Sequence, residues 1–364
     1  MVELRIPGPT PCPPEVLQTM SKQMVDHRGE EFIGILNAVT AKLKQVFMTK
    51  NDLYVLTGSG TGGMEAAVVN TLSPGDKVLA VSIGAFGDRF ATIARIYGAE
   101  VVPLNFEWGK AADPDAIRKA LQADAKIKAV LITHNETSTG ITNDLAAISS
   151  VVKSFDKLLV VDAISSLGSI KCPVDEWHLD IAISGSQKGW MAPPGLAFIS
   201  VSPDAWKAHA SAKMPRYYWD FAQAKRFLER GQTPWTPAVS VVFAMDVALD
   251  MMLKEGLDNI FARHARVSKA ARAGVKSLGL SLFGDEKYAS NTVTAITVPE
   301  GINVRELRRA LRKEHQVVLA GGQGKLEEAI FRIGHLGWVT EANIEKVLSA
   351  LKAALPRAGF AAEK

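Results

Sequence analysis

Residues 158–200 read LLVVDAISSLGSIKCPVDEWHLDIAISGSQKGWMAPPGLAFIS, and this stretch decides the fold. It contains three short apolar runs, Leu158–Val161, Ile181–Ile183 and Leu196–Ile199. Each run has the length of a strand buried on both faces, and each is bounded by polar, Gly or Pro residues. We therefore expect three neighbouring strands in the middle of an open α/β sheet.

Two reactive side chains stand where two of these strands end. The first run ends in Asp162, and the second leads through Ser184–Gln187 to Lys188. Open α/β sheets place their chemistry beyond the carboxyl ends of strands. A lone Asp or Lys is usually a loop residue or a solvated surface group. The small polar residues before this lysine, and Met191–Gly195 after it, favour a shared site instead.

The chemistry that suits this pair is pyridoxal 5'-phosphate (PLP) catalysis. The aldehyde of this cofactor forms a Schiff base with a primary amine, which only Lys supplies from a side chain. Its pyridine nitrogen must stay protonated to draw electrons from a substrate carbanion, and a neighbouring carboxylate raises the pKa of that nitrogen. The sequence thus predicts Lys188 as the Schiff-base lysine and Asp162 as the partner of the pyridine nitrogen.

The motifs around both residues resemble a known family. SGSQKGWMAPPG (184–195), preceded by VVDAISSLG (160–168), is similar to the class V, fold-type I PLP-dependent aminotransferases. It is most similar to their alanine–glyoxylate, serine–glyoxylate and serine–pyruvate branch. The resemblance runs from Pro7 to the segment around Arg332. It implies an α/β fold with a mostly parallel seven-stranded sheet sandwiched by helices, a smaller C-terminal α+β domain, and Gln187 as a further cofactor contact.

Composition sets the outer bounds. The 364 residues exceed one ordinary domain, and 47% hydrophobic with 22% charged residues is the profile of a soluble globular protein. A net charge of +4 gives no reason to expect nucleic acid. Cys12 and Cys172 are too few for a disulfide framework or a zinc cluster, so no metal is expected. The first residues lack the apolar core of a signal peptide and no run could span a bilayer, which predicts a cytoplasmic protein.

Strands alternate with helices from Leu53 to Ser200, which predicts a mostly parallel sheet with helices on both faces. Besides the three runs above, the expected elements are strands at Leu53–Leu56, Val78–Val81, Val101–Leu104 and Ala129–Thr133, and helices at Met64–Leu72, Gly84–Tyr97, Pro114–Ala123, Asp144–Phe155 and Val239–Glu255. The predicted division is a Pro-rich arm at 1–14, a large PLP-binding domain at 15–255 and a small domain at 256–364.

The glycine-rich loop Thr57–Gly63 joins a strand to a helix, an arrangement that can hold a phosphate. N–H groups at a helix start are unpaired, the helix dipole favours an anion, and glycines allow close approach. The resemblance implies that Ser59, Gly60 and Thr61 bind the PLP phosphate.

The same loop also matches the dinucleotide fingerprint G-x-G-x-x-G, through Gly58, Gly60 and Gly63. Alone this match is weak. The fingerprint requires an acid at the end of the next strand to hold a ribose hydroxyl, and Val78–Val81 leads into Ser82–Gly84 instead. A nicotinamide-dependent dehydrogenase would also leave the acid and the lysine above without a role.

Two further residues are expected beside the cofactor ring. Phe86 opens the helix after the second predicted strand, where an aromatic ring can stack on a pyridine. The family branch often has Trp there. Thr137 lies in HNETSTG (134–140), a polar cluster at a strand end that resembles the family's loop beside the cofactor.

The resemblance also implies a homodimer with shared active sites. Two prolines make the Thr233–Pro237 segment an extended loop, which matches the loop that reaches the partner's PLP phosphate in the family. Thr236 matches the contacting position, whereas Thr233 stands where the branch often has Tyr. In the N-terminal arm, Gly8 is expected to line the substrate pocket. The pair His27 and Arg28 resembles a family pair, for which a structural role is favoured.

Arg332 is the predicted holder of the substrate carboxylate. It interrupts the apolar strand Ile330–Ile333, where a charge is costly unless it is paired. A guanidinium forms two parallel hydrogen bonds to a carboxylate. A structural salt bridge is the alternative, but the family's substrate arginine sits in this motif. His335, three residues on, is expected to be structural.

These features predict a homodimeric PLP-dependent transaminase. It would move an amino group from a small amino acid, alanine or serine, to a small 2-oxo acid, glyoxylate or pyruvate, by a ping-pong mechanism with Lys188 as general base and acid. A ureidoglycine–glyoxylate or phosphonate-amine transaminase is the nearest alternative. A cysteine desulfurase needs a mobile cysteine, which neither Cys12 nor Cys172 provides. A PLP-fold subunit without transaminase activity is a further alternative.

Overall fold

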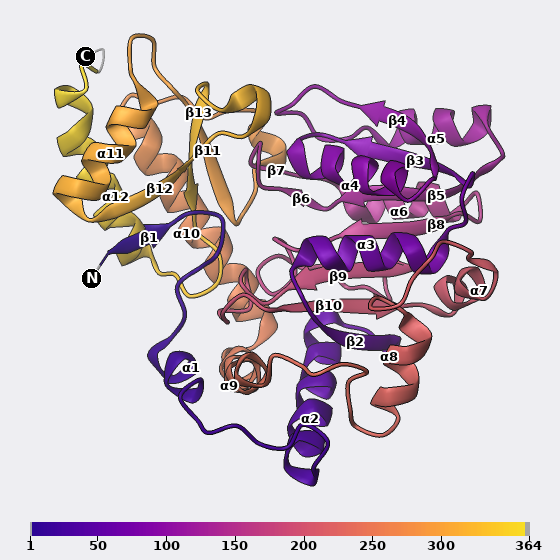
Figure 1. Cartoon of the computed structure of the whole chain (residues 1–364). Coiled ribbons are helices and arrows are strands. Elements are labelled where there is room, and N and C mark those ends of the chain that lie inside the picture. Colours follow the sequence, from indigo (N-terminus) through magenta and orange to yellow (C-terminus); the bar gives the residue numbers. More distant parts are fainter. Residues whose placement is uncertain (1, 361–364) are drawn as a thin grey trace.

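A seven-stranded sheet forms the centre of the computed structural model, which describes residues 2–360 (Figure 1). Only β10 runs against its neighbours, since it pairs antiparallel with β2 and β9 while the other pairs are parallel. The strands, in spatial order, are β2 (Asp52–Thr57), β10 (Leu196–Val201), β9 (Ile181–Gly185), β8 (Leu158–Asp162), β5 (Ile127–Thr133), β3 (Lys77–Ser82) and β4 (Glu100–Asn105). The expected mostly parallel sheet is confirmed, and the three apolar runs of residues 158–200 lie side by side in it.

Helices cover both faces of this sheet, because successive strand residues point to opposite sides. In β8, Leu159 and Val161 join one hydrophobic core and Val160 joins another. The first core is completed by α2 (Glu30–Phe47), α5 (Pro114–Ala123), α6 (Leu145–Lys153) and α9 (Val239–Glu255). The second is completed by α3 (Gly60–Thr71), α4 (Ala85–Ile96), α7 (Pro203–Ser211) and α8 (Phe221–Leu228). Burial on both faces explains why these strands read as continuous apolar runs.

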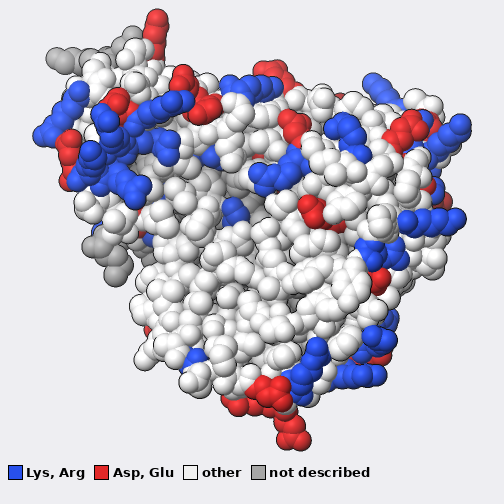
Figure 2. Space-filling view, viewed as in Figure 1, with Lys and Arg blue, Asp and Glu red and all other residues white. Residues whose placement is uncertain are grey.

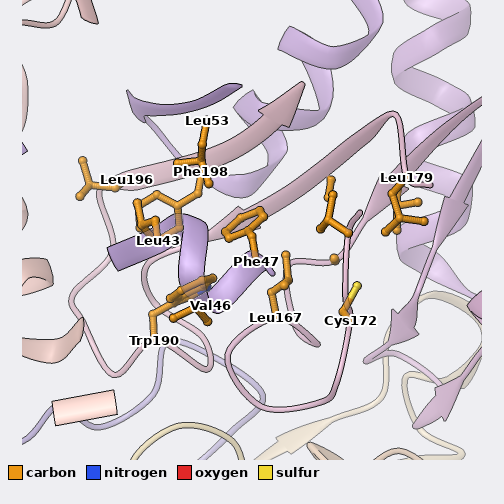
Figure 3. Packing of buried hydrophobic residues seen from close by; sticks show 14 of the residues in the cluster. Leu43, Val46, Phe47, Leu53, Leu167, Cys172, Leu179, Trp190, Leu196 and Phe198 are labelled. Carbon is orange, nitrogen blue, oxygen red and sulfur yellow. The ribbon is translucent and has the colours of Figure 1, made fainter. Parts of the chain in front are cut away.

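Trp190 fixes the loop after β9 to the first core (Figure 3). The indole is fully buried, and it stacks on Phe47 of α2 with 5.6 Å between ring centroids. It meets Phe198 of β10 edge-on at 5.1 Å. Its Nε1 donates a 2.7 Å hydrogen bond to Oγ of Ser184 in β9. Lys188 therefore sits on a loop held by a helix and two strands.

A second, four-stranded sheet lies beside the first, with the order β1-β12-β13-β11 (Figure 1). Its strands are β1 (Glu3–Arg5), β12 (Val317–Gly321), β13 (Ile330–Gly334) and β11 (Val293–Thr297). It shares a core with α10 (Leu257–Ser277), α11 (Val304–His315) and α12 (Glu341–Arg357). The strands and helices expected after residue 256 are therefore present, while a domain boundary at that residue stays a prediction.

The Pro-rich arm contains one short strand, β1, which pairs parallel with β12 at the edge of the small sheet. An edge position tolerates the prolines that follow, which could not join a central strand. Two helices follow the arm, α1 (Pro14–Thr19) and α2, and residues 20–29 between them are not helical. Within residues 2–360, no helix is long and apolar enough to cross a membrane.

The helix after the glycine loop begins earlier than expected, at Gly60 rather than Met64. Glycine is a poor helix former in an interior, but the first turn makes few intrahelical bonds through its N–H groups. Packing also favours small residues there, because a Cβ on Gly62 would lie 2.7 Å from the Trp219 ring. The phosphate loop is therefore the first turn of α3 itself.

Candidate active site

Two adjoining cavities open beyond the carboxyl ends of the parallel strands. Their volumes are about 120 Å³ and about 750 Å³, and they share Phe86, Arg89, Thr137 and Lys188. The smaller cavity reaches the end of β8 and the start of α3, and the larger extends to β12, β13 and α11. The site therefore lies between the two sheets, at the edge where an open α/β sheet binds its ligands.

Lys188 lines both cavities from the loop after β9. Its Nζ donates a 2.7 Å hydrogen bond to the carbonyl oxygen of Pro7. Burial lowers the pKa of this amine to about 8, an effect that Asp162 opposes and that Arg332 and Arg89 reinforce. Because a neutral amine is the form that attacks a carbonyl, Lys188 is suited to react with an aldehyde near neutral pH.

The N-terminal arm closes over this lysine. The Thr10 N–H donates to the carbonyl of Gln187 at 3.1 Å, and Thr10 Oγ1 donates to the carbonyl of Lys188 at 3.0 Å. Gly8 has a φ of +135°, and a Cβ there would lie 2.5 Å from Nζ of Lys188. The structure thus places Gly8 in the larger cavity, and its part in a substrate pocket stays a prediction. It adds Pro7, whose carbonyl the sequence could not single out because every residue has one.

Asp162 ends β8 and is 3% exposed. Its Oδ1 accepts a 3.0 Å hydrogen bond from the Ile164 N–H, and Oδ2 accepts one of 3.3 Å from Oγ1 of Thr133. Burial raises the pKa of this carboxyl to about 6. Glu136 adds to the rise, whereas the two hydrogen bonds and Lys188 oppose it. A buried carboxylate without a bonded cation fits a site for a protonated ring nitrogen.

The first turn of α3 offers unpaired donors to the smaller cavity. Ser59 is the N-cap of this helix, and its side chain makes no capping hydrogen bond. Ser59, Gly60 and Thr61 all line the cavity, so an anion there can accept hydrogen bonds from the N–H groups of the turn. A Cβ on Gly60 would clash with the side chain of Ile164, which lines the same cavity. The turn therefore fits the phosphate of PLP.

Gln187 supplies an acceptor that lacks a donor. Its carboxamide oxygen is buried and has no hydrogen-bond partner among residues 2–360, and the residue lines the smaller cavity. A buried acceptor without a donor is unfavourable, and a donor on a bound polar molecule would relieve it. Together with the recessed amine, the buried acid and the free N–H groups, this oxygen shows that the residues present fit PLP.

Phe86 lies in the first turn of α4, which Glu136 holds in place. Oε2 of Glu136 accepts 3.1 Å hydrogen bonds from the N–H groups of Phe86 and Gly87. The guanidinium carbon of Arg89 lies 4.6 Å from the centroid of the Phe86 ring, and its Nη1 donates to Oγ1 of Thr61 at 3.3 Å. Stacking of Phe86 on the cofactor ring stays a prediction. The sequence does not mark Arg89, because an exposed arginine on a helix is ordinary.

Arg332 stands in the middle of β13, paired across the sheet with Ala295 and Ala320. Its Nε donates to the carbonyl of Gly321 at 2.8 Å, and its Nη1 donates to the carbonyl of Thr137 at 2.7 Å. Burial lowers the pKa of the guanidinium to about 10, and Glu136 opposes this effect. No ion pair between residues 2–360 involves Arg332, and the side chain lines the larger cavity. The structural salt bridge considered above is therefore not formed, and a cation is left for a substrate carboxylate.

Other expected residues lie away from the cavities. Thr236 is exposed and lines neither of them within its own chain. Thr233 is buried and its hydroxyl donates to the carbonyl of Trp235 at 2.7 Å. Arg28 donates to the carbonyl of Thr233 at 2.9 Å, so it holds this loop. His335 is buried against Thr294, which fits a structural role.

The two cysteines offer no nucleophile to the site. Burial raises the pKa of the Cys12 thiol to about 11 and that of the Cys172 thiol to about 12, and neither residue lines either of the two cavities described above. A desulfurase needs a thiolate that reaches the cofactor, so the structure gives that alternative no support. In the part of the chain that the structure describes, no cluster of three or more His, Cys, Asp or Glu could hold a metal ion.

Comparison with known proteins gives one consistent answer. Residues 4–335 match the family model described as aminotransferase class-V. The chain is 45% identical to the soluble hydrogenase 42 kDa subunit of Anabaena cylindrica, over 98% of this chain and 94% of that one. It is 37% identical to the serine–glyoxylate aminotransferase of Methylorubrum extorquens, over 94% and 88%.

Solved structures agree. The ureidoglycine–glyoxylate aminotransferase of Bacillus subtilis superposes with a TM-score of 0.94 at 33% identity, covering 100% of this chain and 95% of the other. With the lysine, the acid and the arginine around one cavity system, the match over nearly the whole length settles the family. The chain belongs to the class V aminotransferases, fold-type I enzymes that use PLP.

Proposed function

We propose that this aminotransferase transfers the amino group of a small amino acid, alanine or serine, to glyoxylate or pyruvate. The observation that carries the proposal is the convergence of Lys188, Asp162 and Arg332 on one cavity system. The names of the Methylorubrum and Bacillus relatives both include glyoxylate, which supports that acceptor.

Each residue has a defined task in this proposal. When bound, PLP supplies the electron sink that stabilises a carbanion at the substrate's α-carbon. Lys188 removes the α-proton and returns it, since its pKa of about 8 lies near neutral pH. Asp162 stabilises a positive charge on the ring nitrogen. Arg332 holds the substrate carboxylate by its free Nη2 edge, which fixes the α-carbon near the amine.

The proposal includes a homodimer with shared active sites. Leu17, Met24, Tyr217 and Tyr218 are large apolar or aromatic residues that are more than 40% exposed. The centre and lower left of the face in Figure 2 carry few charged side chains, whereas charged ones gather along its bottom edge, and Figure 1 places α1 and α9 in the uncharged part. A broad uncharged surface of this kind is typical of a protein–protein interface.

A donor–acceptor matrix tests the proposed substrates. Purified chain loaded with PLP is assayed with alanine, serine, glycine and ureidoglycine as donors, each with glyoxylate and with pyruvate. We expect the highest kcat/KM with alanine or serine, and parallel lines in double-reciprocal plots from a ping-pong mechanism. Bound PLP is recorded separately by its visible absorption, so that loading and turnover are judged independently.

Two outcomes of the matrix would change the assignment. Highest activity with ureidoglycine, or with a phosphonate amine added as a fifth donor, would favour the alternative that the Bacillus neighbour's name suggests. PLP binding without turnover of any donor would instead favour a role as a subunit, as the name of the Anabaena relative suggests.

A further inference from the structure

The larger cavity carries an excess of positive charge that the proposed substrates do not use. One acid, Glu327, lines it, and Oε1 of that acid already pairs with Arg305 at 3.1 Å. The basic residues that line it are Arg89, Lys188, Arg305, Arg308 and Arg332. Lys188 and Arg332 have tasks in transamination, and Arg89 lies over the Phe86 ring. Because Arg305 pairs with Glu327, Arg308 is the one of these five residues that has no assigned partner or task.

Arg308 is held in place by its backbone contact rather than by an acid. It lies on α11, and its Nε donates a 3.0 Å hydrogen bond to the carbonyl of Leu319 in β12. Burial lowers the pKa of its guanidinium. Among residues 2–360, no carboxylate pairs with this side chain, and no hydrogen-bond partner is found for its Nη1 or Nη2. The end of the guanidinium is thus fixed in direction and free to bind.

Gly321 allows this arrangement. A Cβ on Gly321 would lie 2.6 Å from Nη1 of Arg308, so a larger residue there would displace the end of the guanidinium. The carbonyl of the same residue accepts the Nε–H of Arg332. Both arginines are therefore positioned around one residue of β12, and the charge of Arg308 adds to the burial that lowers the pKa of Arg332.

We propose that Arg308 forms a second anion subsite, which extends the donor range to short amino acids whose side chain ends in an acidic group. Arg332 takes the α-carboxylate, and Arg308 takes the side-chain carboxylate or phosphate. The inference rests on the proposed function, because it assumes transamination at Lys188. A cavity of about 750 Å³ has room for a substrate of four or five carbons beyond the site of the amine.

Kinetics of an Arg308→Gln variant test the subsite. The PLP-loaded protein is assayed with aspartate, O-phosphoserine and alanine as donors and glyoxylate as acceptor. We expect the ratio of kcat/KM for aspartate to that for alanine to fall by roughly 10- to 100-fold in the variant, the effect of one charge-assisted hydrogen-bond pair. Arg309→Gln is the matched control, because Arg309 is on the same helix, pairs with Glu306 and lines neither cavity.

A binding measurement tests the same subsite without turnover. Succinate carries two carboxylates and butyrate carries one on a chain of equal length. Calorimetry should show tighter binding of succinate than of butyrate to the PLP-loaded wild type and to Arg309→Gln. Arg308→Gln should bind the two acids with nearly equal affinity.

The outcomes separate this inference from the proposed function. Turnover of alanine without turnover of either acidic donor would overturn the inference and leave the function standing. A uniform loss with all donors in Arg308→Gln would also overturn it and leave the arginine a structural tie between α11 and β12. Loss with aspartate alone would assign the subsite to a carboxylate, and loss with O-phosphoserine alone to a phosphate. Absence of turnover with every donor in the wild type would refute the proposed function itself.

Discussion

Lys188, Asp162 and Arg332 are charged or ionisable groups whose burial is not offset by a bonded partner of opposite charge. Burial shifts each pKa toward the neutral form, to about 8, about 6 and about 10 respectively. Desolvation of this kind destabilises the cofactor-free chain. The same groups become paired when a phosphate-bearing aldehyde and a carboxylate occupy the cavities. These three residues therefore lower the folding stability of the cofactor-free chain, and binding of the cofactor and substrate would offset that loss.

The stability of the cofactor-free chain should depend on pH through Asp162. Its pKa rises from the ordinary 3.8 to about 6 on folding, so the contribution of the protonated acid is fully present below 3.8 and is lost as pH rises through about 6. Asn does not ionise, so cofactor-free Asp162→Asn should exceed the wild type by about 1–3 kcal/mol near pH 7.5, and by less near pH 4. Denaturant unfolding at both pH values measures this. If the free energies of unfolding of the variant and the wild type differed by the same amount at both pH values, the desolvation argument would be contradicted.

The same substitution should remove most catalytic activity. An amide cannot stabilise a positive charge on the ring nitrogen, so Asp162→Asn should retain the fold and some bound PLP but lose most turnover. Circular dichroism, visible absorption and the alanine–glyoxylate assay separate these three properties. Near-native turnover would mean that Asp162 only shapes the turn to Ile164.

Lys188→Ala should abolish turnover. Among the described residues, Lys188 is the only lysine that lines either cavity, so no other amine is placed to move the α-proton. Borohydride treatment of the loaded wild type, followed by peptide mass mapping, should find the reduced cofactor on Lys188. Lys207→Ala is the control, since Lys207 pairs with Asp204 on the surface. A label on another lysine would show the central assignment to be wrong.

At the scale of elements, the first turn of α3 is the predicted phosphate site, and Gly60 in that turn is closely packed. Gly60 faces Ile164, whose side chain a Cβ at residue 60 would meet. Gly34, an exposed residue near the start of α2, faces open space. The same change, glycine to alanine in a helix, should therefore affect PLP binding at residue 60 and only stability at residue 34.

Gly60→Ala should weaken PLP binding, because the turn must shift away from Ile164 and its N–H groups lose their alignment. We expect a rise in the dissociation constant of roughly tenfold or more, the loss of one good hydrogen bond. Gly34→Ala should leave PLP affinity unchanged and stabilise the chain by about 0.5–1 kcal/mol. Fluorescence titration with PLP and denaturant unfolding measure the two effects. Unaltered PLP affinity in Gly60→Ala would argue against a phosphate site at this turn.

The sequence predicted strands and helices well where burial is uniform and less well where contacts between distant segments decide. β8, β9 and β10 are buried on both faces, so their apolar runs marked them clearly. The start of α3 was placed too late, because the packing of Gly60 and Gly62 against Ile164 and Trp219 cannot be read from neighbouring residues.

At the scale of the whole molecule, the site exists because three distant segments meet. Pro7 from the arm, Lys188 from the large sheet and Arg332 from the small sheet line the same larger cavity. The motifs marked the last two residues, since an amine after a buried strand and a charge inside an apolar one are unusual. They could not mark Pro7, or the approach of Arg308 to Gly321, which depend on how the small sheet sits against the arm and α11.

The loop that carries Thr236 raises the question of whether one chain completes its own site. It joins α8 to α9, and within the chain Thr236 lines neither cavity. If Thr236 serves the phosphate in the partner subunit, an active site needs Lys188 from one chain and Thr236 from the other. A Thr236→Glu substitution should disable such a site, because its carboxylate repels the phosphate.

Hybrid dimers distinguish the two arrangements. A Lys188→Ala chain paired with a Thr236→Glu chain keeps one site with both intact halves, so it should recover about half of the wild-type turnover per dimer. A wild-type chain paired with a Lys188→Ala/Thr236→Glu chain keeps no intact site and should be inactive. Two different affinity tags isolate each hybrid from its parents, and native mass spectrometry verifies its composition. If Thr236 acts within its own subunit, the order reverses: the second hybrid is active and the first is not. If Thr236 has no role at the phosphate, both hybrids should be active, since each keeps one chain with an intact Lys188.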